Sequence, residues 1–209
     1  MSLEYDYIIA GGGSAGCVLA SRLANKSKDS ICLVEAGGSG KNLFIKMPAG
    51  NGFIFGNPKF DWGYHSVKQA QLNNRKIYFA RGKGLGGTSI VNGMVYIRGV
   101  AQDYDNWRQM GLDGWGYSDL LPYFKYSEGS TNRQNKFHGN QGPLKVEPAR
   151  NFSVLDEAFI KAAVDTGHEF LDDFNANKRA GVSRIDSTTY RGVRPVSYTH
   201  LTLPTTYHV

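Results

Sequence analysis

The stretch YDYIIAGGGSAGCVLASRLANKSKDSICLVEA, residues 5–36, decides the fold of this chain. Residues 5–10 and 30–36 are short β-favouring runs, and the apolar residues between them have the spacing of a helix that packs on a sheet. The order strand, glycine-rich turn, helix, strand is that of a βαβ unit. It predicts an α/β fold built on a parallel sheet of the Rossmann type.

The turn between the first strand and the helix has the spacing G-x-G-x-x-G, formed by Gly11, Gly13 and Gly16. Gly11 allows the tight turn, Gly13 lets a pyrophosphate approach the main chain, and Gly16 permits close packing of helix and strand. Ser14 and Ala15 stand at the helix start, where free N–H groups and the positive end of the helix dipole favour a phosphate. The turn therefore predicts a dinucleotide site.

An acidic residue ends the second predicted strand. Glu35, followed by Ala36, stands where a carboxylate can accept hydrogen bonds from the hydroxyl pair of a ribose. A carboxylate at this position disfavours a 2′-phosphate. Both FAD and NAD remain compatible with the first 36 residues.

A second glycine-rich stretch, RGKGLGGTSIVNGMVYIRG at residues 81–99, distinguishes these two cofactors. Glycine loses more conformational entropy on ordering than any other residue, so four glycines within residues 82–87 must gain something from a bare backbone. An NAD enzyme of this class needs no such second stretch, whereas a flavin must also be held along its ribityl chain and ring. The combination favours FAD.

Several stretches match one known family. They are DYIIAGGGSAGCVLASRL, LVEAGG, DWGYHSVKQ, the glycine-rich residues 82–99 with Asp105, DYDNWRQMGLDGWGYSDLLPYFKYSE and FHGNQGPLKV. Over about residues 4–194 the chain resembles the N-terminal part of the glucose–methanol–choline (GMC) oxidoreductases, flavoenzymes that oxidise alcohols. The resemblance to the choline dehydrogenase-like branch is closest.

The resemblance implies how FAD is held. Residues 82–89 would lie along its diphosphate and ribityl chain, and residues 92–95 would reach its ring. Val91 stands where some members tether the flavin through a histidine, so the FAD is expected to be non-covalent. The expected cofactor-binding residues are Gly11, Gly13, Ser14, Ala15, Gly16, Glu35, Ala36, Gly84, Gly86, Gly87, Thr88, Asn92, Gly93, Met94 and Val95.

The resemblance also implies hydride transfer from the CH–OH group of a small alcohol, choline or similar, to the flavin, with oxygen, a quinone or another carrier as electron acceptor. In the family a histidine near the far C-terminus removes the alcohol proton. The residues after Arg194 do not supply it, so no catalytic residue is assigned. The alternatives are an inactive FAD-binding fragment, or another flavoenzyme or lyase on the same scaffold.

The chain is expected to be truncated. Residues 1–147 are predicted to form the FAD-binding domain, and residues 148–194 the start of a substrate-binding domain. Residues 195–209 contain no Lys, Arg, Asp or Glu and no clear periodicity. They are predicted to be a non-native linker or adapter tail, in which His200 and His208 have no function.

Polar and aromatic residues outside the two glycine-rich stretches are given structural roles. His65 and His138 each stand in a loop-like stretch without a partner carboxylate, and Asp172 and Asp173 are interpreted as a solvated turn. No metal-ligand spacing is found. The aromatic residues within 103–128 are expected to pack under a helical hairpin, with Ser118 as a helix cap.

The composition, 41% hydrophobic and 20% charged, is that of a soluble globular protein. The net charge of +6 comes from residues 1–100, with 12 Lys/Arg against 5 Asp/Glu, but no cluster suited to nucleic acid is present. There is no membrane-spanning run and no signal peptide. Cys17 and Cys32 are expected to be reduced packing residues. A cytoplasmic location is predicted, and peripheral membrane attachment of the parent protein is left open.

Overall fold

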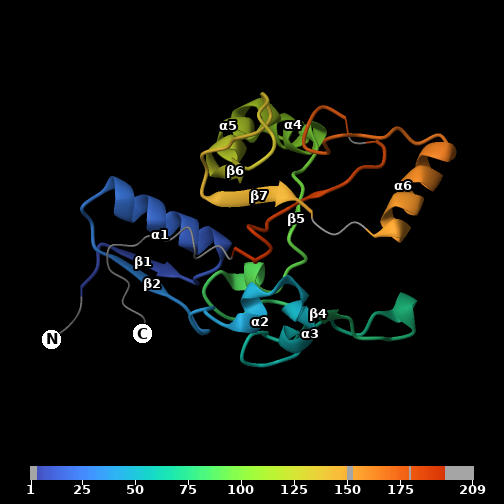
Figure 1. Cartoon of the computed structure of the whole chain (residues 1–209). Helices are drawn as coiled ribbons and strands as arrows, with labels where there is room; N and C mark the ends of the chain where they lie inside the picture. The colour runs from blue at the N-terminus through green and yellow to red at the C-terminus, as the bar shows by residue number, and fades with distance from the viewer. Residues whose placement is uncertain (1–3, 150–152, 179, 196–209) are drawn as a thin grey trace. The chain divides into compact units, whose positions relative to one another are not determined.

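The computed structural model describes residues 4–149, 153–178 and 180–195 (Figure 1). It forms two compact units. Unit 1 holds residues 4–93 and 193–195, and unit 2 holds the described residues between 94 and 192. This division falls at Met94, whereas the boundary near Glu147 concerns cofactor and substrate domains and stays a prediction. Apart from Pro195, the predicted tail lies outside the described residues.

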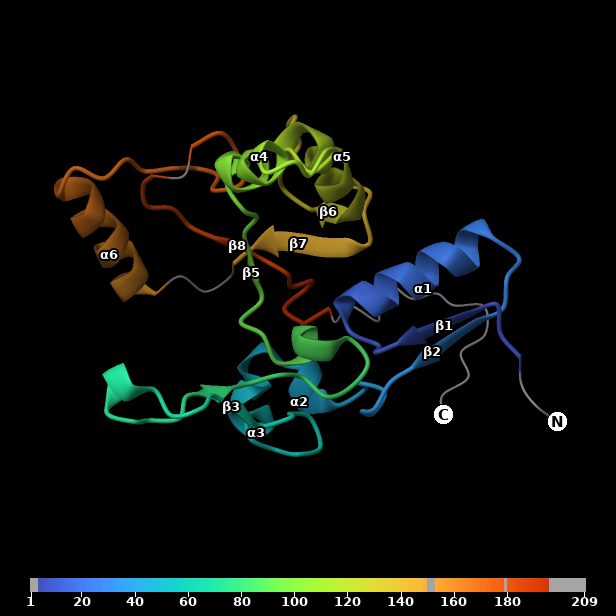
Figure 2. The same ribbon diagram turned by 180° about the vertical axis from the view of Figure 1, so that it is seen from behind.

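Unit 1 begins with the predicted βαβ arrangement. Strand β1 (Tyr7–Ala10) pairs in parallel with β2 (Ile31–Val34), and α1 (Ser14–Lys26) connects them. Figure 2 shows α1 lying along one face of the two strands. The residues that form the core between them are Ile9, Ala20, Leu33 and Leu85, with Leu23 and Ile31 against it. The predicted α/β class is confirmed, and Cys17 and Cys32 are buried as expected.

The rest of unit 1 consists of short elements. They are α2 (Leu43–Lys46), the 3₁₀ turn η1 (Pro48–Gly50), α3 (Asn51–Ile54), β3 (Tyr64–His65), η2 (Ala70–Leu72), β4 (Tyr78–Phe79) and η3 (Gly87–Ile90). Strands β3 and β4 form an antiparallel hairpin. A second apolar cluster, formed by Ile45, Ile54, Phe60, Ile90 and Val91, lies beneath these elements. Short elements of this kind depend on such packing, because few residues of each can form internal hydrogen bonds.

A buried cation ties this second cluster together. The side chain of Arg194 is 2% exposed, and its Nε donates to Ile45 O at 3.0 Å. Its Nη1 donates to the main-chain and side-chain oxygens of Asn92 at 2.6 and 2.8 Å, and its Nη2 donates to Asn51 Oδ1 at 2.8 Å. All of these acceptors are neutral, and desolvation lowers the pKa of Arg194. The guanidinium therefore joins α2, α3 and the end of the second glycine-rich stretch.

Unit 2 contains a mixed sheet with the strand order β5-β8-β7-β6. Its elements are β5 (Val95–Tyr96), α4 (Ala101–Gln109), α5 (Tyr117–Ser127), β6 (Glu128–Ser130), β7 (Leu144–Pro148), α6 (Val154–Asp165) and β8 (Asp186–Ser187). Strands β6 and β7 are parallel, and the other pairs are antiparallel. None of the helices in the described part of the chain has both the length and the apolar composition needed to cross a membrane.

The expected helical hairpin is formed by α4 and α5. The ring of Tyr104 contacts those of Trp107, Tyr117 and Phe124, which confirms aromatic packing between the helices. The prediction of Ser118 as the cap is wrong. Helix α5 starts at Tyr117, two residues earlier than such a cap implies, and the N–H of its N-cap, Gly116, donates to the Asp119 carboxylate at 3.1 Å. The acid three residues after the cap therefore supplies one half of a capping box, the bond to the N–H of the cap residue.

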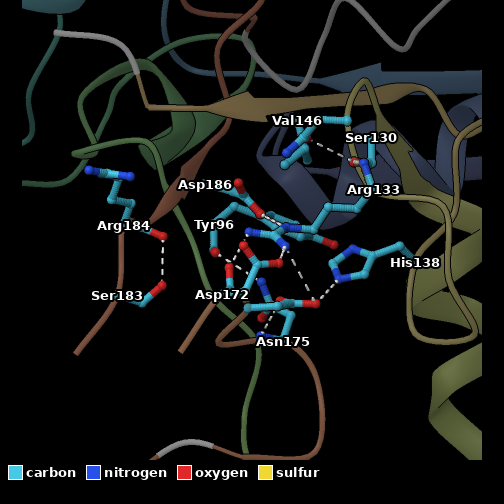
Figure 3. Close-up of polar contacts among 12 residues, drawn as sticks. Tyr96, Ser130, Arg133, His138, Val146, Asp172, Asn175, Ser183, Arg184 and Asp186 are labelled. Atoms are coloured by element: carbon cyan, nitrogen blue, oxygen red, sulfur yellow. Dashed lines mark hydrogen bonds and ion pairs between the residues drawn. The ribbon is translucent and has the colours of Figure 1, made fainter. Parts of the chain in front are cut away.

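The interior of unit 2 is largely polar (Figure 3). Among its described residues, the buried apolar ones are Val146, Leu171 and Val182. They are outnumbered by buried polar ones, which are Arg98, Glu128, Ser130, His138, Glu147, Asn175, Asp186 and Ser187. Since a buried polar group costs free energy unless it is hydrogen-bonded, this interior requires a connected set of partners.

His138 lies at the centre of that set, so its interpretation as a residue without a carboxylate partner is wrong. Nδ1 lies 2.7 Å from Glu128 Oε1, and Nε2 lies 2.8 Å from Asp173 Oδ2. Burial alone would lower the pKa of His138, but the hydrogen bonds and charges of Asp173 and Glu128 raise it to about 9. The ring is therefore a buried imidazolium at neutral pH, and its structural role is retained for a different reason.

Two arginines complete the network. Arg98 Nη2 donates to Glu128 Oε2 at 2.7 Å, and Arg133 Nε donates to Asp186 at 2.5 Å. Arg133 also bonds the exposed Asp172 at 3.0 Å. The side chain of Asp173 is only 8% exposed, so the interpretation of this pair of aspartates as a solvated turn is right for Asp172 and wrong for Asp173.

The imidazolium makes the stability of unit 2 depend on pH. The folded-state pKa of His138 lies above its ordinary value of 6.5. Its contribution, roughly 3 kcal/mol, is therefore fully present below about pH 6.5 and is lost as the pH rises through about 9. Urea unfolding followed by tryptophan fluorescence between pH 6 and 10 measures this loss.

The two neighbouring aspartates provide a matched comparison for this prediction. Asp173→Asn removes a buried partner of the imidazolium, so the fall in the free energy of unfolding should move to lower pH. Asp172→Asn changes an exposed carboxylate and should leave the midpoint of the fall unchanged. Equal behaviour of the two variants would contradict the assignment of the charge to His138.

Candidate nucleotide-binding groove

A groove of about 1010 Å³ in unit 1 is formed by both glycine-rich stretches. The first stretch and β2 supply one wall, and residues near β3 and η3 supply the other. The lining residues are Ile9, Ala10, Gly11, Gly13, Ser14, Ala15, Gly16, Leu19, Val34, Glu35, Ala36, Trp62, Tyr64, Arg81, Gly82, Gly87 and Thr88. Nine of the fifteen expected cofactor-binding residues are among them.

The three glycines of the first turn have different structural requirements. Gly11 has φ +98°, a conformation that favours glycine. A Cβ on Gly16 would lie 2.0 Å from Gly11 O, so close helix–strand packing needs a glycine there, as predicted. A Cβ on Gly13 would meet nothing within 4 Å. The protein's own packing does not require Gly13, and this position opens onto the groove.

The second glycine-rich stretch packs against the first through its main chain. Gly86 N donates to Gly12 O at 2.8 Å, and Gly87 has φ +54°. A Cβ on Gly87 would lie 2.8 Å from Gly13 Cα, and one on Gly37 would lie 2.3 Å from Gly84 N. Several glycines of the second stretch are therefore needed for contacts within the protein, independently of any ligand.

The contact between the two glycine-rich stretches at Gly12, Gly13, Gly86 and Gly87 is called the junction below, and Glu35 stabilises it. Its Oε2 accepts from Gly12 N at 2.7 Å, and its Oε1 accepts from Gly37 N at 2.8 Å. Each carboxylate oxygen has a further lone pair that can face the groove. The predicted bond to a ribose remains a prediction, and the structure adds a second role for Glu35 in holding the two turns.

The start of α1 supplies hydrogen-bond donors. The N-cap is Gly13, no acidic residue lies in the first turn, and no cap side chain covers the helix end. Within the described residues, the N–H groups of Ala15 and Gly16 donate to no protein acceptor. These groups and the helix dipole favour an anionic group in the groove.

Three residues of the opposite wall were missed by the sequence reasoning: Trp62, Tyr64 and Arg81. The buried Asp61 positions them, because its carboxylate accepts hydrogen bonds from the N–H groups of Gly63 and Arg81 and from the Tyr78 hydroxyl. Burial alone would raise the pKa of Asp61, but these bonds lower it to about 2. The short motif DWGYH was a signal for this wall. The strand that pairs with it, β4, lies further along the chain and is not part of the motif.

Six expected residues do not line the groove. Gly84 and Gly86 lie in the junction behind it, and Asn92 is held by Arg194. Gly93 is exposed at the end of the first part of unit 1, whereas Met94 and Val95 belong to unit 2. Met94 has φ +61°, and its carbonyl accepts from Thr188 N at 2.7 Å. Their contact with a cofactor stays a prediction.

No catalytic assembly is found in the part of the chain that the structure describes. His65 is exposed, and its Nδ1 lies 3.0 Å from Gly63 O. The buried His138 is enclosed by its ion pairs in unit 2. Among the described residues, no group of three or more His, Cys, Asp or Glu side chains could hold a metal ion.

The fold and the groove define a dinucleotide-binding α/β protein of the flavoprotein type. The GMC oxidoreductase family model matches residues 5–205, so the chain belongs to the GMC oxidoreductases, which are FAD flavoproteins. The chain is 43% identical over 192 residues to an oxygen-dependent choline dehydrogenase of Sinorhizobium fredii, and 40% over 196 residues to one of Vibrio vulnificus. These alignments cover 92% and 93% of the chain.

The chain spans 35% of the length of these curated relatives. Among solved structures, it is similar to pyridoxine 4-oxidase from Mesorbium loti, with a TM-score of 0.88, 33% identity and coverage of 94% of this chain and 39% of that one. It is also similar to a formate oxidase, with a TM-score of 0.88, 26% identity and coverage of 98% and 38%. Both comparisons agree with the family assignment.

Because Gly13 and Gly16 have different structural roles, replacing each with alanine should affect stability differently. Gly16→Ala places a methyl group against Gly11 O and should destabilise unit 1 strongly, because main-chain atoms must move. Gly13→Ala has open space and φ −71°, so it should cost at most about 1 kcal/mol, the expense of alanine at an N-cap. Thermal unfolding without added cofactor compares the two. A Gly13→Ala variant as unstable as Gly16→Ala would show that Gly13 is needed for folding.

Proposed function

We propose that the groove binds FAD, with Gly13, Ala15 and Gly16 at its diphosphate and Glu35 at a ribose. The observation that carries this proposal is that both glycine-rich stretches line one groove, onto which Gly13 opens without being required by packing. The unbonded N–H groups at the start of α1 suit a diphosphate. Asn92 to Val95 are proposed to reach the flavin ring, as the family resemblance implies.

The proposed association is non-covalent. The side chain of Val91 is 2% exposed within the apolar cluster of unit 1, and it has no nucleophilic atom. It offers no atom for a flavin tether. Arg194 and the tight junction of the glycine-rich stretches fix the loop that surrounds Val91.

The whole protein is proposed to oxidise the CH–OH group of a small alcohol such as choline. The two relatives named as oxygen-dependent choline dehydrogenases support this substrate class. When bound, FAD supplies the two-electron acceptor. The described residues hold and orient it, and they offer no base for the alcohol proton. The electron acceptor is proposed to be oxygen, a quinone or another carrier, and the location cytoplasmic.

A second candidate is a related flavoenzyme reaction. The similarity to a formate oxidase favours it, since formate is not an alcohol and the same scaffold therefore accommodates another substrate. Oxidation of choline, pyridoxine and formate by a protein that contains this chain, each measured by dye reduction, separates the candidates.

The first functional prediction concerns cofactor binding. The chain should quench FAD fluorescence on titration and should not bind NADH. Gly13→Val fills the space proposed for the diphosphate and should abolish FAD binding. Glu35→Ala removes charge-assisted hydrogen bonds worth about 1.5–3 kcal/mol and should only weaken it.

Gly52→Val is the matched control, because a Cβ on Gly52 also meets nothing within 4 Å and Gly52 lies outside the groove. It should bind FAD as the unmodified chain does. If Glu35→Ala were as damaging as Gly13→Val, the placement of the diphosphate at Gly13 would be wrong. If the chain bound NADH in preference to FAD, the proposal that FAD is the cofactor would be wrong.

The second functional prediction concerns turnover. The 209-residue chain alone should not reduce a dye with choline or simple primary alcohols, because a positioned general base contributes about 10²–10⁴-fold and none is found among the described residues. A family-like continuation after Arg194 should restore turnover, and replacing its histidine base should remove most of it. FAD-dependent turnover by the 209-residue chain would refute the proposed absence of a base.

A further inference from the structure

Unit 1 contains a second cavity, of about 240 Å³, that shares no lining residue with the groove. It is lined by the loop before α2, by Lys59 and Phe60, and by residues of the second glycine-rich stretch. We propose that this cavity binds a small organic anion, with a carboxylate or phosphate group at its lysines and a short apolar body on its floor. This proposal goes beyond the proposed function and does not depend on it.

The charge of the cavity wall has one sign. Lys41, Lys59 and Lys83 line it, and none of the lining residues is acidic. Within the described part of the chain none of these lysines forms an ion pair, although six lysines and arginines elsewhere do. The ammonium groups of Lys59 and Lys83 lie 5.6 and 4.9 Å from the ring centroids of Phe60 and Trp62. Such cation–π contacts do not neutralise the charge, so an anion would be attracted.

Neutral donors stand beside the lysines. The hydroxyl and N–H groups of Ser39 and the N–H of Lys41 donate to no acceptor among the described residues. Asn42 Oδ1 accepts from Phe44 N at 2.9 Å, which leaves the amide nitrogen of its side chain as the donor. Oxygen atoms of a carboxylate or phosphate are the matching acceptors for this set.

The floor of the cavity explains why the ligand should be organic. Ile45, Ile90 and Phe60 line it, and they also belong to the apolar cluster of unit 1. Arg194 lies behind this floor, bonded to Ile45 O at 3.0 Å and to Ser89 O at 3.3 Å. Its buried charge has neutral acceptors and adds to the positive potential at low effective dielectric.

The test uses the purified 209-residue chain and three probes: benzoate, phenyl phosphate and the neutral benzyl alcohol. Saturation-transfer NMR and calorimetry should detect benzoate or phenyl phosphate, and whichever binds more tightly identifies the anionic group. Benzyl alcohol should bind at least about tenfold more weakly, and added salt should weaken binding of the anions. Equal binding of benzoate and benzyl alcohol would overturn the proposal.

Two double variants with the same change in net charge locate the site. Lys41→Gln/Lys59→Gln should weaken anion binding about tenfold, whereas Lys68→Gln/Lys76→Gln, on exposed positions outside the cavity, should not. Equal weakening, or none, would overturn the proposal. Displacement of the anion by FAD would place it in the groove and also overturn the proposal. If FAD itself does not bind, the anion result stands and only the proposed function fails.

Discussion

The close approach of two glycine-rich main chains is the constraint on which the groove depends. Gly86 N bonds to Gly12 O, and Gly87 lies so near Gly13 that a side chain at Gly87 has no room. Backbone contacts of this kind need no side-chain specificity, but they require bare backbone at matched positions on both stretches. Glu35 then holds Gly12 and Gly37 on either side of the contact. The candidate groove is a consequence of this junction, because its two walls are the faces that the junction brings together.

The features that depend on residues close together in the chain could be predicted from the sequence. The βαβ order follows from hydrophobic periodicity, and the roles of Gly11 and Gly16 follow from the geometry of a strand-to-helix turn. The reason for glycine at Gly84 and Gly87 was only partly predicted. A ligand was expected to require the bare backbone, and the structure shows that the protein's own turns require it as well.

What the sequence could not predict depends on residues far apart in the chain. The residues next to His138 in the sequence include no carboxylate, because its partners Glu128 and Asp173 are 10 and 35 residues away. Trp62 joins the groove because Asp61 bonds to Arg81 N, 20 residues further along. Such contacts leave no periodic signal, since each depends on one side chain that reaches across a fold whose loops must already be placed.

The ion network of unit 2 has a consequence for how this protein can vary. Removing one member of a buried ion pair costs about 3–5 kcal/mol, a large share of the roughly 5–15 kcal/mol that stabilises a domain. Glu128, His138 and Asp173 are joined in series, so the loss of one removes a partner from at least one buried charge in an interior with few apolar residues. Substitutions at these three positions must therefore occur together during evolution, because a protein in which only one of them has changed is unstable. Related chains should keep the whole triad or replace it as a whole.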